Sequence, residues 1–284
     1  MKSEGLVESI RQRLLNVSRR NGEAFDFVLA RYGVERFLYR LSVSPRADRF
    51  VLKGAMLFHV WNHGMHRPTR DLDLLGFGED DVVSVREALL EVIRTEVPDD
   101  GLHFDGASMK VEEIREEAFY GGIRAKVVAR LGNVKIPLQI DVGFGDAVVP
   151  APECRNYPTL LDGFDSASLA TYPARTVIAE KLEALVRLDA FNTRMKDFFD
   201  LHWLLDSEVR EDAQLPKAIE ATFERRRTAF PDRVPTGLTM AFARAKQPMW
   251  QAFLNKNGLQ APSLEDVVIA IRTKLPVKWK DEAF

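Results

Sequence analysis

Two runs of alternating apolar and polar residues constrain the fold of this chain more than any other feature. They cover residues 123–131 and 134–144, and Gly132-Asn133 lies between them. This pattern is typical of a β-hairpin with one buried face. In the second run Asp141 and Pro137 lie on the face opposite to the apolar side chains. Because Pro lacks a backbone N–H, Pro137 predicts a strand that is bulged or partly at an edge.

The rest of the N-terminal half mixes helices with strands. Residues 1–40 have the apolar spacing of two helices, residues 51–61 that of a third, mostly buried helix, and residues 82–97 that of a fourth. Residues 71–76 alternate as a short strand does. A strand-rich region extends from about residue 110 to residue 144.

The composition changes between residues 150 and 173, where Pro, Asp, Ser and Tyr accumulate and periodicity fades. We therefore predict a domain boundary at residue 160. Beyond it the pattern is helical, over residues 174–190, 194–206, 211–228, 237–256 and 263–274. The sequence thus predicts an α+β fold: a mixed β-sheet core with flanking helices over residues 1–160, and a helical bundle over residues 161–284.

Composition excludes several classes of protein. Apolar residues make up 46% and charged residues 29% of the 284 residues, enough for a folded core. No apolar run is long enough to span a membrane, and the N-terminus lacks a signal-peptide pattern. The single cysteine, Cys154, excludes a disulfide framework. We expect a cytoplasmic protein with no membrane partner. The net charge of −2 argues against general electrostatic binding of nucleic acid but is compatible with a local basic patch.

Three carboxylates form the candidate metal site. Asp71 and Asp73 are two residues apart on one predicted strand, so their side chains leave the same face roughly 6–7 Å apart. Such a pair repels unless a cation lies between, and Mg²⁺ prefers oxygen ligands. Asp141, on the polar face of its strand, is the natural third ligand, and three carboxylates suit two-metal phosphoryl or nucleotidyl transfer. The alternative is that Asp71 and Asp73 are hydrated residues at a strand end.

Neighbouring residues suit a phosphate. Thr69 and Arg70 directly precede Asp71, which places a hydroxyl and a cation beside the carboxylates. Gly54, upstream, costs roughly 1 kcal/mol in a helix interior relative to Ala and so indicates a close approach. Backbone N–H groups near Gly54 could meet phosphate oxygens.

Buried charges mark the helical half. Lys181 falls on the apolar stripe of its helix, so its ammonium must reach water or meet an anion, which a triphosphate would supply. Asp197 and Asp200 are i,i+3 neighbours in a helix that is otherwise rich in Phe and Leu. Two interpretations stay open: Lys181 and Arg194 neutralise them as helix-packing ion pairs, or one of them lies beside the reacting hydroxyl or the lysine.

Four segments in order, LKGAMLFHVWNHGMHRPTRDLDLL, LQIDVGFGD, AEKLEAL and RMKDFFDL, resemble the motifs of the AbiEii/AbiGii toxin family. These are nucleotidyltransferase-like toxins of bacterial toxin–antitoxin and phage-abortive-infection systems. The resemblance spans residues 51–205. It implies a nucleotidyltransferase core of the DNA-polymerase-β type with a helical C-terminal half.

The resemblance also implies roles for individual residues. The metal-binding pair is matched by Asp71 and Asp73, and the second motif's carboxylate by Asp141. The lysine of the third motif is matched by Lys181, and the fourth motif by Lys196, Asp197 and Asp200. The family usually has Gly-Ser or Gly-Gly where this chain has Gly54-Ala55, so a hydroxyl contact to phosphate would be missing here. Nucleotide contacts are expected from Gly54, Thr69, Arg70, Lys181 and Lys196.

The function implied is Mg²⁺-dependent transfer of a nucleoside monophosphate from an NTP to an RNA 3′ hydroxyl. Because some members resemble enzymes that modify the tRNA acceptor end, tRNA is the leading substrate by analogy. The family further implies a cognate antitoxin, and control by modification of a hydroxyl, for which Thr69 is the candidate. Two alternatives stay open: modification of a protein hydroxyl or a small molecule, and a non-catalytic nucleotide-binding module.

Overall fold

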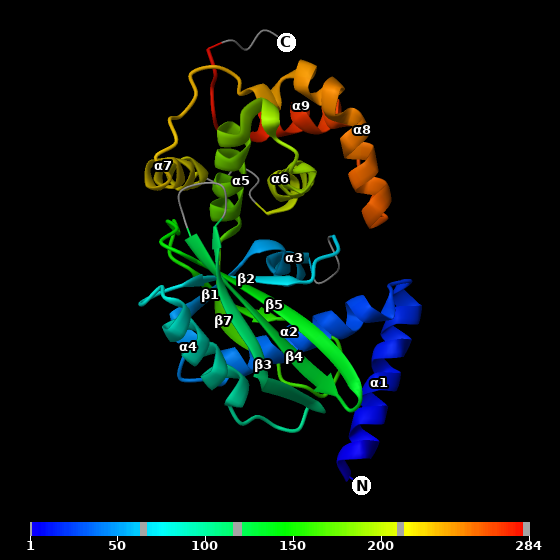
Figure 1. Cartoon of the computed structure of the whole chain (residues 1–284). Coiled ribbons are helices and arrows are strands. Elements are labelled where there is room, and N and C mark those ends of the chain that lie inside the picture. The colour runs from blue at the N-terminus through cyan, green and yellow to red at the C-terminus, as the bar shows by residue number, and fades with distance from the viewer. Residues whose placement is uncertain (1, 63–66, 116–120, 209–212, 281–284) are drawn as a thin grey trace. The chain divides into compact units, whose positions relative to one another are not determined.

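The computed structural model describes residues 2–62, 67–115, 121–208 and 213–280, drawn in colour in Figure 1. These residues fall into two compact units. The first comprises Met1–Gly145 and Glu153–Thr171, and the second comprises Asp146–Pro152 and Tyr172–Phe284. Each unit is described by itself below.

The first unit is built on one seven-stranded sheet within the described residues, with the order β3-β4-β5-β2-β1-β7-β6. The β2–β5 and β1–β7 pairs are parallel and the others are antiparallel, which confirms the predicted mixed sheet. The strands are β1 (Phe50–Lys53), β2 (Asp71–Gly76), β3 (Leu102–Arg115), β4 (Gly121–Leu131), β5 (Val134–Phe144), β6 (Glu153–Tyr157) and β7 (Ala167–Thr171).

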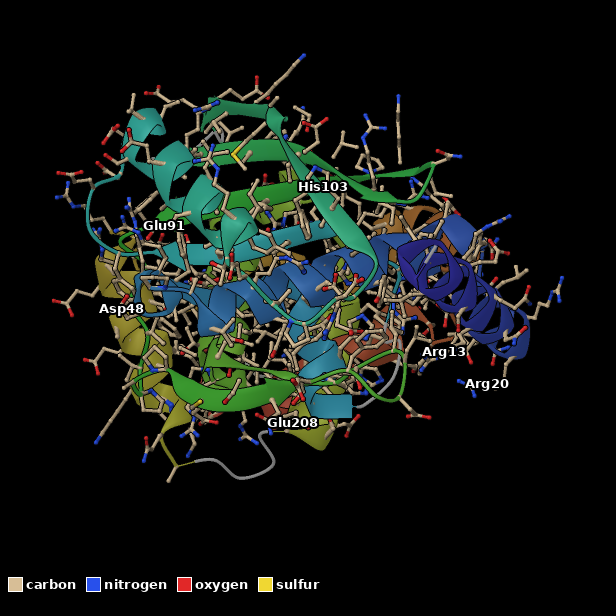
Figure 2. The ribbon with its side chains drawn as sticks, turned by 90° about the horizontal axis from the view of Figure 1, so that it is seen from below. Arg13, Arg20, Asp48, Glu91, His103 and Glu208 are labelled. Carbon is tan, nitrogen blue, oxygen red and sulfur yellow. The ribbon has the colours of Figure 1, made fainter. Side chains whose placement is uncertain are left out.

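Helices cover the apolar face of this sheet. They are α1 (Lys2–Asn21), α2 (Phe25–Val43), α3 (Leu57–Asn62) and α4 (Val82–Arg94). Helix α2 approaches β5 closely at Gly33, where an added Cβ would lie 3.1 Å from Ile136 Cγ2. Helix α4 begins at Asp81, whose carboxylate accepts the N–H groups of Val83 and Ser84 and so caps the first turn. Figure 2 views the helices from below and labels the charged residues Arg20 on α1 and Glu91 on α4.

The second unit is helical, as predicted. Its helices are α5 (Ala174–Leu188), α6 (Met195–Ser207), α7 (Leu215–Arg225), α8 (Met240–Asn257) and α9 (Leu264–Lys274). Aromatic side chains form much of its core: the Phe198 and Phe242 rings stack at 5.8 Å, and Trp250 is fully buried. Helix α8 starts at the capping hydroxyl of Thr239. No helix in the described part of the chain is long and apolar enough to cross a membrane.

A half-buried guanidinium fastens the segment 146–152 to the helices of the second unit. Arg226, just after α7, lies 3.2 Å from Asp146, 3.3 Å from Glu180 and 2.9 Å from Glu183, all N···O distances. Glu183 is fully buried and also accepts the hydroxyl of Thr228. Because removing one partner from such a cluster leaves an uncompensated buried charge, the cluster holds α5, α7 and this segment in one arrangement.

The predicted helix over residues 51–61 is wrong in its first part. Residues 50–53 form the interior strand β1, residues 54–56 a 3₁₀ turn, and only residues 57–62 form α3. Phe50, Val51 and Leu52 are all buried, because β1 lies inside the sheet between β2 and β7. A strand buried on both faces gives a continuous apolar run, which periodicity cannot distinguish from a buried helix.

Strands β6 and β7 lie in the segment where the sequence showed no periodicity. Strand β7 pairs with β1 at Leu52↔Thr171, which attaches it to the sheet of the first unit. The first unit therefore extends to Thr171, and the second unit also includes Asp146–Pro152, whereas we predicted a single boundary at residue 160.

Pro137 lies where β5 is paired on one side only within the described residues. It faces Val128 of β4, whereas pairing with β2 begins at Gln139. The predicted partial edge is confirmed, and a proline is tolerated there because one side of the strand forms no ladder.

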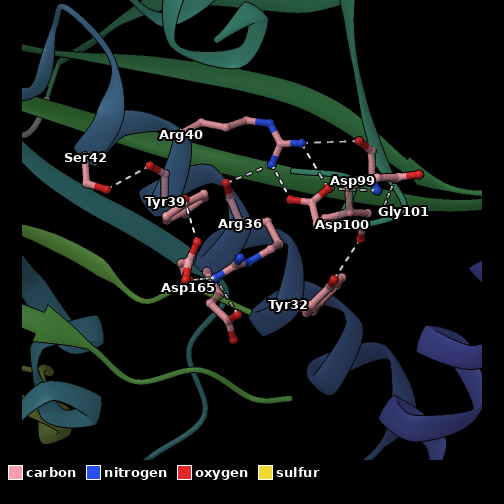
Figure 3. Close-up of polar contacts among 11 residues, drawn as sticks. Tyr32, Arg36, Tyr39, Arg40, Ser42, Asp99, Asp100, Gly101 and Asp165 are labelled. Atoms are coloured by element: carbon pink, nitrogen blue, oxygen red, sulfur yellow. Dashed lines mark hydrogen bonds and ion pairs between the residues drawn. The ribbon is translucent and has the colours of Figure 1, made fainter. Parts of the chain in front are cut away.

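Helix α2 carries an unusual set of buried charges (Figure 3). Arg40 donates to both carboxylate oxygens of Asp100, over 2.6 and 3.0 Å. The Tyr32 hydroxyl donates to the Asp100 carbonyl oxygen over 2.8 Å. These bonds fasten the turn before β3 to α2, and the bidentate geometry compensates the cost of burying both charges.

One turn earlier, Glu35 and Arg36 fasten the loop between β6 and β7. The Leu160 N–H donates to Glu35 over 2.6 Å, and Arg36 donates to the Asp165 carbonyl oxygen over 2.7 Å. Glu35 is 1% exposed and lies 2.9 Å from the Arg36 guanidinium. Burial raises the pKa of Glu35 from 4.5 to about 7, although the charge of Arg36 and the hydrogen bond from Leu160 oppose the rise.

We predict that Glu35 makes stability depend on pH. Because its pKa is raised on folding, the folded chain binds the proton more tightly, and the free energy of unfolding falls as the pH rises from about 4.5 to about 7. Between pH 5 and pH 8 the wild type should lose about 1 to 3 kcal/mol more than Glu35→Gln, measured by denaturant unfolding. Parallel pH profiles for the two proteins would contradict this.

Candidate functional site

The register between β2 and β5 brings the three predicted metal ligands onto one face. Asp73 pairs with Asp141 and Asp71 pairs with Gln139. Because side chains at paired positions of neighbouring strands point to the same side, Asp71, Asp73 and Asp141 share a face. The intervening Leu72 and Leu74 are fully buried on the other side. The three acids therefore lie on the face opposite to the helix-covered core.

Exposure and neighbouring charge differ among the three carboxylates. Asp71 is exposed, Asp73 is half-buried, and the side chain of Asp141 is 17% exposed. Lys53, the last residue of β1, pairs with Asp73 from the other side and so brings an ammonium to the same face. Positive charge beside closely spaced carboxylates lowers the cost of their mutual repulsion.

Gly54 lies directly against Asp73. Its φ is +74°, and a Cβ added there would overlap Asp73 Oδ2 and lie 2.7 Å from both the Cβ and the Cγ of Asp73. Only glycine avoids both the steric strain of this φ and the overlap. The close approach that Gly54 predicted therefore involves Asp73, whose carboxylate is held between β1 and the 3₁₀ turn that follows it.

Asp141 is held by a residue that the sequence analysis missed. Arg124 of β4 donates to Oδ1 over 2.8 Å and to Oδ2 over 2.7 Å. The hydrogen bonds to Asp141 raise the pKa of Arg124 above its ordinary value, against a smaller opposing effect of burial. The hairpin contained the signal for this pair, because a two-residue turn that pairs Leu131 with Val134 also pairs Arg124 with Asp141.

The carboxylates on this face fit a divalent cation. Asp71 and Asp73 offer carboxylate oxygens on one exposed face, the ligands that Mg²⁺ takes together with water and substrate phosphates. Both oxygens of Asp141 already accept hydrogen bonds. Across the residues that the structure describes, no three His, Cys, Asp or Glu side chains are grouped as a metal site.

The residues before β2 differ in where they point. Arg70 forms an ion pair with Asp26 of α2, and its guanidinium lies over the Phe27 ring, 4.1 Å from the centroid. In this conformation Arg70 is turned toward α2 and not toward the carboxylates. Thr69 is half-buried in the loop that enters β2, two residues before Asp71.

In the second unit, Lys181 of α5 meets two buried carboxylates of α6. Its Nζ lies 2.9 Å from Asp197 and 2.7 Å from Asp200, and Arg194 donates to Asp197 over 2.6 Å. The Asp197 and Asp200 side chains are 1% and 0% exposed, and that of Lys181 is 13% exposed. Of the two interpretations left open, the structure shows the helix-packing ion pairs. It also places the lysine beside both acids, whereas Lys196 is exposed on α6.

Burial and charge oppose each other at Asp197. Desolvation favours the neutral carboxyl, but the nearby cations of Lys181 and Arg194 outweigh it and lower the pKa below its ordinary value. Asp197 is therefore ionised and holds the lysine and arginine in place.

We predict that Gly54→Ala lowers the free energy of unfolding more than Gly78→Ala does. Both glycines have positive φ, but a Cβ at Gly78 would meet nothing within 4 Å. Gly78→Ala, the control, should lose about 1–2 kcal/mol of unfolding free energy from backbone strain. Gly54→Ala should lose about 1–3 kcal/mol more, because its Cβ overlaps Asp73. Denaturant unfolding measures both losses. Equal losses would show that Asp73 does not rest on Gly54.

Comparison with known proteins places the chain in a family. Residues 36–275 match the family described as "Nucleotidyl transferase AbiEii toxin, Type IV TA system". Two solved structures from Helicobacter pylori are similar over 84% of this chain. One is a candidate nucleotidyltransferase (16% identity, 88% of that chain, TM-score 0.44), and the other is JHP933 (15% identity, 86% of that chain, TM-score 0.40). No curated protein matches the chain. Because the family match spans most of the sequence, the chain belongs to the AbiEii family of nucleotidyltransferase toxins from type IV toxin–antitoxin systems.

Proposed function

We propose that this nucleotidyltransferase uses Mg²⁺ to transfer a nucleoside monophosphate from an NTP to the 3′ hydroxyl of tRNA, which blocks translation and growth. The observation that carries the proposal is the Asp71–Asp73 pair on one exposed face, with Asp73 resting on Gly54, in a chain of this family. In the reaction the acceptor oxygen bonds to the α-phosphorus and the bond to the bridging oxygen breaks. Pyrophosphate then leaves, and the hydroxyl proton passes to solvent.

The first unit supplies the cation site and the acceptor face. Asp71 and Asp73 would hold Mg²⁺, which on binding neutralises charge on the triphosphate and the departing pyrophosphate. Gly54 keeps the Asp73 carboxylate close to the backbone at the end of β1. Because phosphoryl transfer depends mainly on positioning and electrostatics, this fixed carboxylate pair is the main contribution of the sheet.

For Lys181 we propose the role that the family motifs imply, neutralising negative charge on the phosphates. Its ammonium is fixed within the second unit by Asp197 and Asp200, which act as positioning residues for it. The two carboxylates fix the direction of this ammonium, which electrostatic stabilisation requires. Nucleotide contacts by Gly54, Thr69, Arg70 and Lys196 stay predictions from the sequence.

Regulation of the toxin follows from the family. A type IV system implies a cognate antitoxin. We also retain Thr69 as the candidate modification site, because a phosphate two residues before Asp71 would repel a bound triphosphate. Cytoplasmic location fits a tRNA substrate and stays a prediction.

The test is a labelling assay with the full chain, Mg²⁺, each labelled NTP and total RNA. We expect label at the 3′ end of tRNA with the wild type. Asp71→Asn and Asp73→Asn should lower the rate by at least roughly 100-fold, because each removes a charged ligand of the cation. Lys181→Met should also lose activity, with thermal unfolding recorded to confirm that its second unit is folded.

The matched control is Asp105→Asn. Asp105 lies on β3 on the same face of the sheet, paired with Arg130 at 3.7 Å and well away from β2 in the strand order. It should label within about twofold of the wild type. Equal labelling by Asp71→Asn would contradict the proposal. Label in protein or in a small solute would contradict the RNA acceptor, and nucleotide binding without pyrophosphate release would contradict catalysis.

A further inference from the structure

Positive charge lies beyond the carboxylates on the polar face of the sheet in the first unit. Lys126 of β4 pairs with Gln139 of β5, and Gln139 pairs with Asp71 of β2, so these three residues form one row across the sheet. The row continues to β3, where Lys110 pairs with Lys126. Because neighbouring strands lie about 4.8 Å apart, the first of these lysines is about 10 Å from Asp71.

A second group of cations lies farther along the hairpin of β4 and β5. Arg130 of β4 pairs with Lys135 of β5 and with His103 of β3. His103 is exposed on this edge strand and is labelled in Figure 2. Lys126 and Arg130 leave the same face of β4, about 13 Å apart along the strand. We call the four residues Lys110, Lys126, Arg130 and Lys135 the cationic strip.

Like charges face each other twice in the cationic strip. Lys110 lies directly opposite Lys126, and Arg130 lies directly opposite Lys135. Directly opposed like charges destabilise a pair of strands, whereas opposite charges at the same positions would stabilise it. The hairpin does not need these pairs for its fold, because its other face is apolar and buried. An anion that lies across both pairs would remove the repulsion.

Neighbouring acids neutralise the strip only in part. Glu112 lies 3.5 Å from Lys126, and both side chains are more than half exposed. Asp105 lies 3.7 Å from Arg130. Ion pairs as exposed as these contribute little free energy and are screened by salt, so phosphates in solution can replace the acids as partners.

The other two lysines of the strip have no acid beside them among the described residues. Lys110 and Lys135 are both exposed, and neither forms an ion pair in the part of the chain that the structure describes. The strip and its two acids together carry a net charge of +2, whereas the whole chain carries −2. The strip is thus a local basic patch, of the kind that the overall charge allowed.

We propose that the cationic strip binds the phosphate backbone of the RNA acceptor. This inference rests on the proposed function and deepens it. Arg130 and Lys135 lie more than about 15 Å from Asp71, which is beyond the reach of a small-molecule acceptor whose hydroxyl reacts at the acids. An RNA chain spans this distance and carries a phosphate at every nucleotide. Such contacts position the acceptor and carry no sequence information.

The test measures binding of a fluorescently labelled tRNA transcript to the full chain by anisotropy, without NTP, over a series of salt concentrations. The double variant Lys110→Gln, Lys135→Gln should bind tRNA at least about 10-fold more weakly at low salt, because two phosphate contacts are lost. For the same reason its slope of log affinity against log salt should be shallower by about 1 to 2.

The matched control is the double variant Arg86→Gln, Arg94→Gln. Both arginines are exposed on α4, on the helix-covered side of the same sheet, and neither forms an ion pair within the described ranges. The control removes the same charge but should bind tRNA within about twofold of the wild type. Circular dichroism shows whether each variant is folded, and the single variants Lys110→Gln and Lys135→Gln decide the question if the double variant is not.

Three results would overturn the inference. The first is equal tRNA affinity of the strip variant and the wild type, and the second is an equal loss in the control. The third is competition by polyglutamate as effective as that by unlabelled tRNA, because the strip would then suit an acidic polypeptide. Failure of the proposed function has a different signature: the strip variant loses tRNA binding as predicted, but the wild type adds no nucleotide to tRNA.

Discussion

The register of β2 against β5 is the constraint on which the candidate site depends. Leu72 and Leu74 face the core beside Ile140 and Val142, all fully buried, and this apolar packing fixes which residues pair. A slip of one residue would turn Asp71 and Asp73 into the core and expose the leucines, at a cost of several kcal/mol. The same hydrophobic contacts that stabilise the sheet thereby place the acids on its polar face, where Gly54 leaves room for Asp73.

Paired charge is the second organising feature of both units. The Arg40–Asp100 pair fastens a turn to α2. Arg226 forms ion pairs with acids of α5, and Lys181 of α5 forms ion pairs with acids of α6. Each of these cations meets acids of another segment, so the buried charges specify which elements lie together and not only how tightly they pack. The Lys181 cluster combines a structural and a proposed functional role, because the acids that make its burial tolerable also fix the direction of its ammonium.

Much of the architecture could be predicted because the local spacing of apolar residues determines it. The hairpin of β4 and β5, strand β2 and the five C-terminal helices all follow from residue spacing. Strand β1 could not be recognised, since burial on both faces removes the alternation that marks a strand, and β7 is a strand only because it pairs with β1. The pairing of Arg124 with Asp141 could have been predicted, because the hairpin turn fixes the register of the two strands. Which strand lies beside β5 depends on contacts distant in sequence, which no local pattern contains.

The binding of a divalent cation by the Asp71–Asp73 pair is the central claim, and anomalous diffraction from crystals grown with Mn²⁺ tests it most directly. The account predicts an anomalous peak bonded to carboxylate oxygens of Asp71 and Asp73. The absence of a peak at Asp71 and Asp73 at saturating Mn²⁺ would contradict it.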